Sequence, residues 1–586
     1  MKTKIMFMAV AAMMALGFAS CNLDYFPSDE LTGDALLSDE KGAQYIIDGC
    51  YAMLKEEYVY VETYSSSNYY ARHYFQMAEF PADNTCLSGR TTDPLYQATC
   101  YKMTDNLKNN SLLWWIGYKV ILSANTVIEH YKEGENAECD QLIGEAYFLR
   151  ALMHFNLVTL FAKPYSHGRD NLGVVIRTST TTDETHRAKV GEVYDQVVAD
   201  LWKATGLMGK SRGNAGYASK NAALGLLSRV YLYEEKNDSV LYVVDQMGDP
   251  VANLDPDFEN YFPKALSSKE TLFAIAHTAL ETRAKGSIGS MYYDEVDANG
   301  KGKGVGWGEV YASAPLLNLF DRYPEDKRLS YIKPQYTTAT GNLVYFPIPS
   351  KDDFRNTMSA AVKTDTQGKY CMLDTKEIEK IVEKDGRQDT TYKKARYDIH
   401  EVKVNGMNEE DASGEYKTYY VEYEGEKCYA RIDKSLSQRN TYPMYFVTKF
   451  SYQDGDPMLS SPVMLRWAEV LLNRAEAYAK LGQDDKALAD VDAIRNRAGI
   501  PADGMFSTGN RHGYTNVLDI VLDERRLELC FEGHRMFDVY RNKRDMDRRF
   551  PGVQPWEVVK YDDNKIQYPI PYGEHSVSGI QQNPGY

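Results

Sequence analysis

The sequence lacks the cysteine spacings that mark several small-domain and metal-binding classes. Its 586 residues include eight cysteines, and none of them form the CxxC pair that zinc ribbons and thioredoxin-like motifs use. A disulfide scaffold is also excluded, because such scaffolds are short chains that are dense in cysteine. Cys86 and Cys100 are the one pair that we single out as a candidate disulfide.

The chain also lacks an excess of positive charge. It has 67 Lys and Arg against 83 Asp and Glu, for a formal net charge of −16 at pH 7. Nucleic-acid binding needs a basic surface that neutralises phosphates, so we expect no nucleic-acid partner. Hydrophobic residues at 43% and charged residues at 26% are typical of a well-packed globular protein.

An apolar run at the N-terminus is too short to span a membrane. Two lysines precede the uncharged stretch Ile5–Phe18, whereas a spanning helix needs about 18 or more apolar residues. This order is typical of an export signal. The next residues are Ala19, Ser20 and Cys21, which resemble the lipobox of bacterial lipoproteins, with Phe18 in place of the commoner leucine. We expect removal of residues 1–20 and lipidation of Cys21; a plain secreted protein is the alternative.

Apolar residues recur at helical spacing in two parts of the chain, about 111–250 and 463–545. The helical period is clearest in four stretches, Leu142–Phe161, Ala222–Tyr233, Val463–Arg497 and Asn516–Arg541. The sequence therefore predicts a mainly α fold.

Two helix pairs have the spacing of a tetratricopeptide repeat, in which small, aromatic and apolar residues alternate. The clearer pair contains Ala475, Tyr478, Ala487 and Val491, with Gly482 in the turn. The less regular pair contains Ser228, Tyr231, Val240 and Val244. Each pair in such an array buries its apolar face only against a neighbouring pair. We therefore expect a tetratricopeptide-like helical-repeat scaffold.

Between the helical parts, residues 260–460 lose the helical period and gain glycine, proline, tyrosine and short alternating runs. Tyr397–Val404 and Thr418–Tyr423 are each followed by a turn pair ending in glycine, which is a hairpin signal. We expect residues 55–110 and 260–460 to form a loop-rich lobe with small β-hairpins, within a single unit over 21–586. Loops on a rigid scaffold are where binding residues concentrate.

Two aromatic clusters in this lobe are candidate ligand sites. The chain has 46 Tyr against 20 Phe, and tyrosine combines an apolar face with a polar edge. The first cluster contains Tyr69, Tyr70, Asp83, Asn84 and Arg90. The second contains Tyr292, Tyr293, Trp307 and Tyr311, around alternating glycines. The alternative role for each tyrosine is packing.

The second cluster is the stronger candidate, because glycine lets a loop approach a ligand closely and an exposed tryptophan is costly without a role. Five glycines alternate from Gly300 to Gly308, but they match neither GxGxxG nor GxxxxGK[ST]. We expect a flexible loop rather than a nucleotide site.

Two C-terminal segments resemble a known family. LRWAEVLLNRAEA at Leu465–Ala477, continued by IRNRAG at Ile494–Gly499, and DERRLELCFEGHRMFDV at Asp523–Val539 are similar to the signature helices of the SusD/RagB family of outer-membrane nutrient-binding lipoproteins. The chain end from Tyr568 to Tyr586 is similar to that family's terminal segment. Further matches to the family are Leu23, Asp24, Pro27, Trp115, Tyr118, Asn125, Glu145, Arg150 and Ala151.

The resemblance implies a lipoprotein anchored at the cell surface in the outer membrane. Such a protein captures an oligosaccharide and delivers it to a TonB-dependent (SusC-like) outer-membrane transporter. The resemblance also implies that the protein binds its ligand without catalysing a reaction. The alternatives are a peptide-binding or protein-binding member of the family and a glycoside hydrolase, although no motif singles out the carboxylate pair that a hydrolase needs.

The signature segments themselves have the spacing of a structural motif. Arg525, Glu528 and Glu532 are three and four residues apart, so their charges can pair along and between helices. His534 and Asp538 lie one helical turn apart, but no third ligand accompanies them. We expect neither a metal site nor a cofactor.

Overall fold

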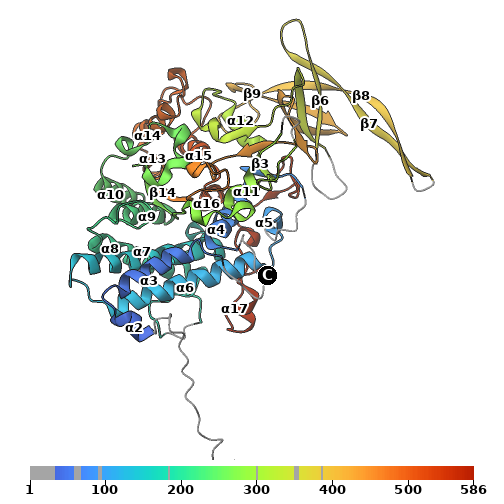
Figure 1. Ribbon diagram of the computed structural model, residues 1–586. Coiled ribbons are helices and arrows are strands. Elements are labelled where there is room, and N and C mark those ends of the chain that lie inside the picture. The colour runs from blue at the N-terminus through green and yellow to red at the C-terminus, as the bar shows by residue number, and fades with distance from the viewer. Residues whose placement is uncertain are drawn as a thin grey trace, which may run out of the picture.

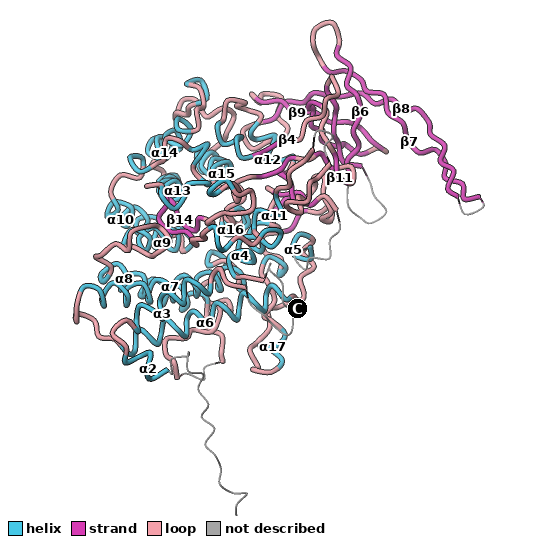
Figure 2. Tube along the Cα trace, in the orientation of Figure 1, coloured by secondary structure: helices cyan, strands magenta, loops and turns pink. Residues whose placement is uncertain are grey.

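The computed structural model describes residues 33–57, 68–89, 96–181, 185–297, 301–348, 356–384 and 387–586. Helices make up most of the body, and strands gather at one end of it (Figures 1 and 2). The predicted mainly helical, tetratricopeptide-like fold is confirmed. Cys21 and Arg90, with the export signal, lie outside the described residues.

The N-terminal half is helical. Its helices are α2 Gly33–Ser38, α3 Gly42–Met53, α4 Tyr70–Glu79, α5 Tyr96–Thr99, α6 Lys108–His130, α7 Ala137–Phe161 and α8 Val190–Leu207. Helices α3, α6 and α8 pack against α7. Asn136 caps α7, because its side chain accepts the N–H groups of Glu138 and Cys139. Helix α6 is long and apolar enough to cross a membrane by length and composition alone, yet most of it is buried within the fold.

The two predicted repeat pairs are present. They are α9 Lys220–Tyr233 with α10 Asn237–Met247, and α13 Trp467–Lys480 with α14 Asp484–Arg497. Ala475, Ala487 and Val491 are buried in one apolar cluster, and Gly482 turns the chain at a φ of +70°. The Asn473 amide donates a 3.0 Å hydrogen bond to the Ser228 hydroxyl, so a polar contact joins the pairs.

Two of the predicted helical stretches are interrupted. Val463–Arg466 forms strand β14, which pairs antiparallel with β2, Thr271–Ala274. Periodicity alone cannot distinguish a strand from a helix in such a short, fully buried apolar run. The second stretch breaks between α15, Val517–Glu528, and α16, Arg535–Arg541.

The break after α15 has a specific cause. Phe531 and Gly533 have φ values of +69° and +76°. Their N–H groups donate to the Glu79 carboxylate, at 3.2 and 3.0 Å, instead of to the preceding helical turn.

The predicted hairpins belong to a closed six-stranded antiparallel barrel, in the order β10-β5-β6-β7-β8-β9. The strands are β5 Asn342–Ile348, β6 Asn356–Thr364, β7 Tyr370–Lys384, β8 Arg387–Val404, β9 Tyr416–Tyr423 and β10 Glu426–Lys434. Glu424 and Gly425 turn between β9 and β10 with positive φ, as a type I′ turn requires. The distal part of β7 and β8 extends beyond the barrel as a ribbon (Figure 1).

Further short strands and helices lie outside the barrel and the long helices. The strands are β1 Thr85–Leu87, β3 Val310–Ala312, β4 Ile332–Pro334, β11 Gln438–Arg439, β12 Tyr442–Pro443, β13 Tyr445–Val447, β15 Met546–Asp547 and β16 Val558–Val559. The helices are α11 Ile288–Tyr292, α12 Ala314–Phe320 and α17 Tyr572–Ser576. Strand β1 pairs with β3 and β4 pairs with β13.

The structure contradicts the candidate disulfide between Cys86 and Cys100. Cys86 and Cys100 are thiols, and each hydrogen-bonds to a backbone carbonyl of a later segment. The Sγ atoms lie 2.9 Å from the Pro551 oxygen and 3.5 Å from the Val553 oxygen, respectively.

Buried ion pairs join β14 to the C-terminal helices. The Arg466 guanidinium contacts the carboxylates of Glu270, Glu528 and Glu532 at 2.8, 2.6 and 2.7 Å. Burial alone would raise the pKa of Glu528, but the guanidinium groups of Arg497, Arg466 and Arg328 outweigh it and hold that pKa well below its usual value. Glu528 is therefore a buried carboxylate that its cation partners keep charged.

Replacing Glu528 with glutamine is expected to destabilise the protein strongly, because it leaves cations buried with fewer partners. The expected loss is about 3–5 kcal/mol in the free energy of unfolding, measured by urea denaturation. Asp547→Asn is the control: its pair with Arg549 is exposed and should contribute about 0–1 kcal/mol. Equal losses for the two variants would contradict a structural role for the buried network.

Candidate functional site

The structure places six of the nine candidate site residues in the interior. Tyr69, Tyr70, Asp83, Asn84, Tyr292 and Tyr311 are each at most 6% exposed. Helix α4 carries Tyr70 into the core, where its hydroxyl accepts a 2.9 Å hydrogen bond from Asn156. These side chains offer almost no surface to a ligand, and the four tyrosines pack in the interior.

Asp83 and Asn84 have structural partners. Asp83 forms ion pairs with Arg535, at 2.8 Å, and with Arg526, at 3.2 Å. The Asn84 side-chain oxygen accepts a 2.9 Å hydrogen bond from Arg526 Nε. Both residues therefore join the segment after α4 to the signature segment that contains α15 and α16.

Two candidate residues, Tyr293 and Trp307, reach the surface. Trp307 is 48% exposed, and Tyr293 is partly buried. The Tyr293 hydroxyl shares a hydrogen bond with the hydroxyl of Tyr452, whose side chain is 37% exposed. The rings of the two tyrosines lie 5.6 Å apart at an angle of 59°. We call Tyr293, Trp307 and Tyr452 the aromatic surface.

A carboxylate organises the glycine run that presents Trp307. Asp294 accepts hydrogen bonds from the N–H groups of Gly304, Val305 and Gly306, at 3.1, 2.8 and 3.2 Å. A Cβ on Gly306 would lie 2.1 Å from the carbonyl oxygen of Tyr293. The glycines let the backbone wrap closely around Asp294, so the described part of this run is pinned rather than flexible, contrary to expectation.

Polar contacts also hold Trp307 in place. Its backbone N–H donates to the Ser290 carbonyl at 2.7 Å, and its indole N–H donates to the Lys285 carbonyl at 3.1 Å. Two cations lie beside it: the Lys285 ammonium is 5.0 Å from the ring centroid, and Arg439 donates to the Trp307 carbonyl at 2.6 Å. The indole is thus exposed but fixed.

Sequence reasoning missed Tyr452, Lys285 and Arg439. Tyr452 has a φ of +70°, a conformation that is uncommon for a residue other than glycine. The following Asp454 and Gly455 also have positive φ, and an Asp-Gly pair is a turn signal. That signal marks a turn, but it does not indicate that the turn meets Tyr293.

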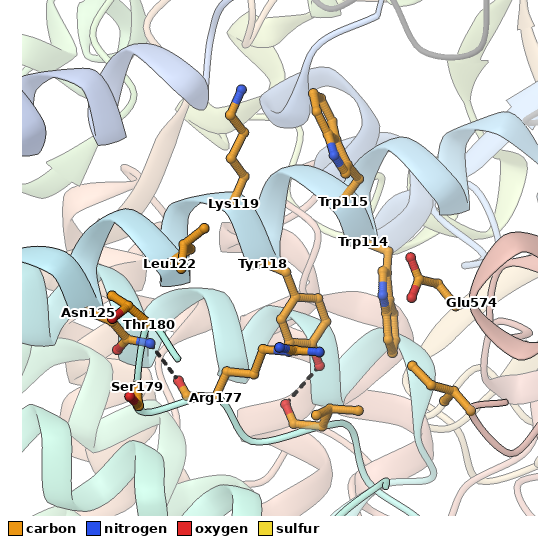
Figure 3. A pocket seen from close by; sticks show the side chains of 12 residues that line it. Trp114, Trp115, Tyr118, Lys119, Leu122, Asn125, Arg177, Ser179, Thr180 and Glu574 are labelled. Atoms are coloured by element: carbon orange, nitrogen blue, oxygen red, sulfur yellow. Dashed lines mark hydrogen bonds between the residues drawn. The ribbon is translucent and has the colours of Figure 1, made fainter. Parts of the chain in front are cut away.

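A cavity of about 380 Å³ lies elsewhere, between α6, residues 175–180 and the C-terminal segment (Figure 3). None of the eight candidate residues that the structure describes lines it. Its wall includes Trp115, Tyr118 and Asn125, which sequence analysis noted only as part of the family resemblance. Among the described residues no group of three or more His, Cys, Asp or Glu is placed to hold a metal ion.

Gly306→Ala is expected to displace the run that presents Trp307, because its Cβ has no room beside the Tyr293 carbonyl. Hydrogen exchange of the amides at 304–306 should become faster, since their bonds to Asp294 lengthen or break. Gly206→Ala is the matched control, as a Cβ there meets nothing within 4 Å. Unchanged exchange in Gly306→Ala would show that Asp294 does not organise the run.

Comparisons with known proteins cover nearly the whole chain. A family model described as "SusD family" matches residues 269–586, and one described as "Starch-binding associating with outer membrane" matches residues 34–232. The chain is similar to SusD-like protein P2 of Formosa agariphila, with 22% identity over 505 residues, which cover 83% of this chain and 82% of the relative.

Solved structures share the fold. A SusD superfamily protein from Bacteroides thetaiotaomicron has 22% identity and a TM-score of 0.65, and the match covers 92% of this chain and 99% of that one. Surface glycan-binding protein A from Bacteroides fluxus has 18% identity and a TM-score of 0.58, with 94% and 100% covered.

Proposed function

The chain belongs to the SusD family, and from that premise we propose that it is a cell-surface protein that binds a glycan at its aromatic surface without altering it. The observation that carries this proposal is the fixed, half-exposed indole of Trp307, on a glycine run whose backbone packs against that of Tyr293. The names of the relatives support it, since one is called a surface glycan-binding protein and one family model is described as starch-binding.

The chemistry of the aromatic surface suits a sugar. A pyranose ring has a face of C–H groups that packs on an aromatic ring, and it has hydroxyls that need directional donors and acceptors. Trp307 supplies the flat apolar face, and the tyrosine hydroxyls supply polar edges. Because the two tyrosine rings are inclined by 59°, the surface can follow a curved chain of sugars.

Three carboxylates near the aromatic surface are engaged in structure. Asp294 accepts three backbone N–H groups, Glu309 pairs with Arg439 at 2.9 Å, and Asp456 accepts the Met458 N–H and the Thr282 hydroxyl. A glycosidase needs one carboxyl group to donate a proton and a second to act as base or nucleophile. These engagements favour binding over hydrolysis.

Trp307→Ala should weaken binding of the cognate glycan by about tenfold or more, which corresponds to about 1.4 kcal/mol or more. Isothermal titration calorimetry against a panel of host and plant glycans measures this. Tyr242→Ala, which removes an exposed aromatic ring from α10, is the control and should bind as the unaltered protein does. Binding of peptides but of no glycan would favour the peptide-binding alternative, and release of reducing ends would favour a hydrolase.

Membership of the same family supports a proposal for the location and the partner. We propose that Cys21 carries the lipid anchor, that the protein stands on the outer face of the outer membrane, and that it delivers its ligand to a TonB-dependent transporter. The description of the N-terminal family model, which mentions association with the outer membrane, supports this. Stable anchoring by several acyl chains follows from about 0.8 kcal/mol for each buried CH₂ group.

Cys21→Ser should move the protein from the membrane fraction to the soluble fraction of lysed cells, whereas Cys139→Ser should leave it membrane-bound. Protease added to intact cells should degrade the unaltered protein. Chemical cross-linking on those cells should recover a large outer-membrane barrel with it. Complete protection from protease would contradict the cell-surface location, and recovery of no barrel would contradict the transporter partnership.

A further inference from the structure

We propose that Lys285 is the specificity-determining residue of the aromatic surface, where its ammonium group donates hydrogen bonds to the oxygens of a sugar that stacks on the Trp307 indole. The inference rests on the proposed function, because it assigns a role at the same site. It adds a directional donor to a surface that supplies mainly apolar contact.

The backbone of Lys285 is held against the indole. Its carbonyl accepts the Trp307 indole N–H at 3.1 Å. Lys285 lies in a tight turn, which the Gly286 N–H closes on the Arg283 carbonyl at 2.8 Å. The Arg283 guanidinium is anchored by an ion pair with Glu57 at 2.7 Å. The start of the lysine side chain is therefore fixed relative to the ring.

The end of the same side chain returns to the ring. The Lys285 ammonium lies over the Trp307 ring, 5.0 Å from its centroid. This distance is within the range of a cation–π contact, about 6 Å, but it exceeds the separation of stacked carbon atoms, about 3.5–4.0 Å. A sugar carbon can thus approach the indole more closely than the ammonium does. In such a complex the ammonium lies beside the sugar, within reach of its hydroxyl groups.

The other donors at Trp307 are already engaged. The indole N–H is used by the Lys285 carbonyl. Arg439 pairs with Glu309 at 2.9 Å and donates to the Trp307 carbonyl at 2.6 Å. Among the residues that the structure describes, none forms an ion pair with Lys285, whose ammonium contacts the indole. An ammonium has three N–H donors, so this group can donate to more than one sugar oxygen.

The relative strengths of the two contacts favour a role in binding. A cation–π contact at an exposed site is weaker than a hydrogen bond to a charged donor. The Lys285 ammonium therefore gains when it turns toward a sugar oxygen, and its contact with the ring keeps it close by before the sugar arrives. Because the donor stands on one side of the stacked face, it distinguishes sugars by the direction of their hydroxyl groups.

Fluorescence quenching by iodide tests the contact without a glycan. Iodide gathers near an ammonium, so the part of the quenching that Trp307→Phe removes should fall by about twofold or more in Lys285→Met. Lys303→Met is the matched control, because Lys303 lies on the same glycine run but pairs with Glu295 at 3.1 Å; its quenching should not change. Equal quenching in Lys285→Met and the unaltered protein would overturn the inference, whatever glycan is bound.

Calorimetry with maltoheptaose, cellohexaose and xylohexaose tests the role in binding. Lys285→Met keeps the apolar stem but loses the donors, so it should weaken binding of the best of these ligands by about tenfold. Lys285→Arg keeps N–H donors and a charge and should lose less, and Lys303→Met should bind as the unaltered protein does. All variants should keep the urea midpoint of the unaltered protein.

The inference and the proposed function fail in different ways. If Trp307→Ala weakens binding but Lys285→Met does not, the inference is overturned and the proposed function stands. If Lys285→Arg loses as much as Lys285→Met, the donors are not what the ligand uses, which also overturns the inference alone. If Trp307→Ala binds as the unaltered protein does, the proposed function fails and the inference fails with it.

Discussion

The ion network around Arg466 is the constraint on which the arrangement of the helical body depends. A buried guanidinium is costly to desolvate unless carboxylates meet it in good geometry. Its partners are Glu270, which precedes β2, Glu528 at the end of α15, and Glu532 in the turn between α15 and α16. Arg497 at the end of α14 contacts Glu270 at 2.8 Å. The repeat helices and the β2–β14 pair therefore have to meet at this point if the charges are to be satisfied.

The signature segment Asp523–Val539, which contains Glu528 and Glu532, also contacts the N-terminal half of the chain. Arg526 and Arg535 hold Asp83, and Glu79 accepts the two N–H groups at which the α15 helix ends. The segment after α4 is thus fixed from the C-terminal side. This explains why Asp83, a polar residue in a tyrosine-rich segment, serves the scaffold instead of a ligand.

Long apolar stretches with helical spacing could predict the helices: α14 has one buried face, and α7 and α9 are buried on nearly every side. It could not predict the barrel: closure requires β10 to pair with β5, which lies far away in the chain, and hairpin signals describe only neighbouring strands. Nor could composition distinguish buried tyrosines from exposed ones. Tyr292 and Tyr293 are adjacent, yet the first is fully buried and the second reaches the surface. Tyr452 was missed because its contact with Tyr293 depends on how two distant turns meet.

The rigidity of the aromatic surface bears on how it can bind. Trp307 stands on irregular backbone, so its position depends on the three hydrogen bonds to Asp294 and on the Ser290 carbonyl. These bonds order the backbone before any ligand arrives, and an ordered site loses less conformational entropy on binding. Affinity at the proposed site should then depend on the chemistry of the exposed side chains rather than on the cost of arranging them.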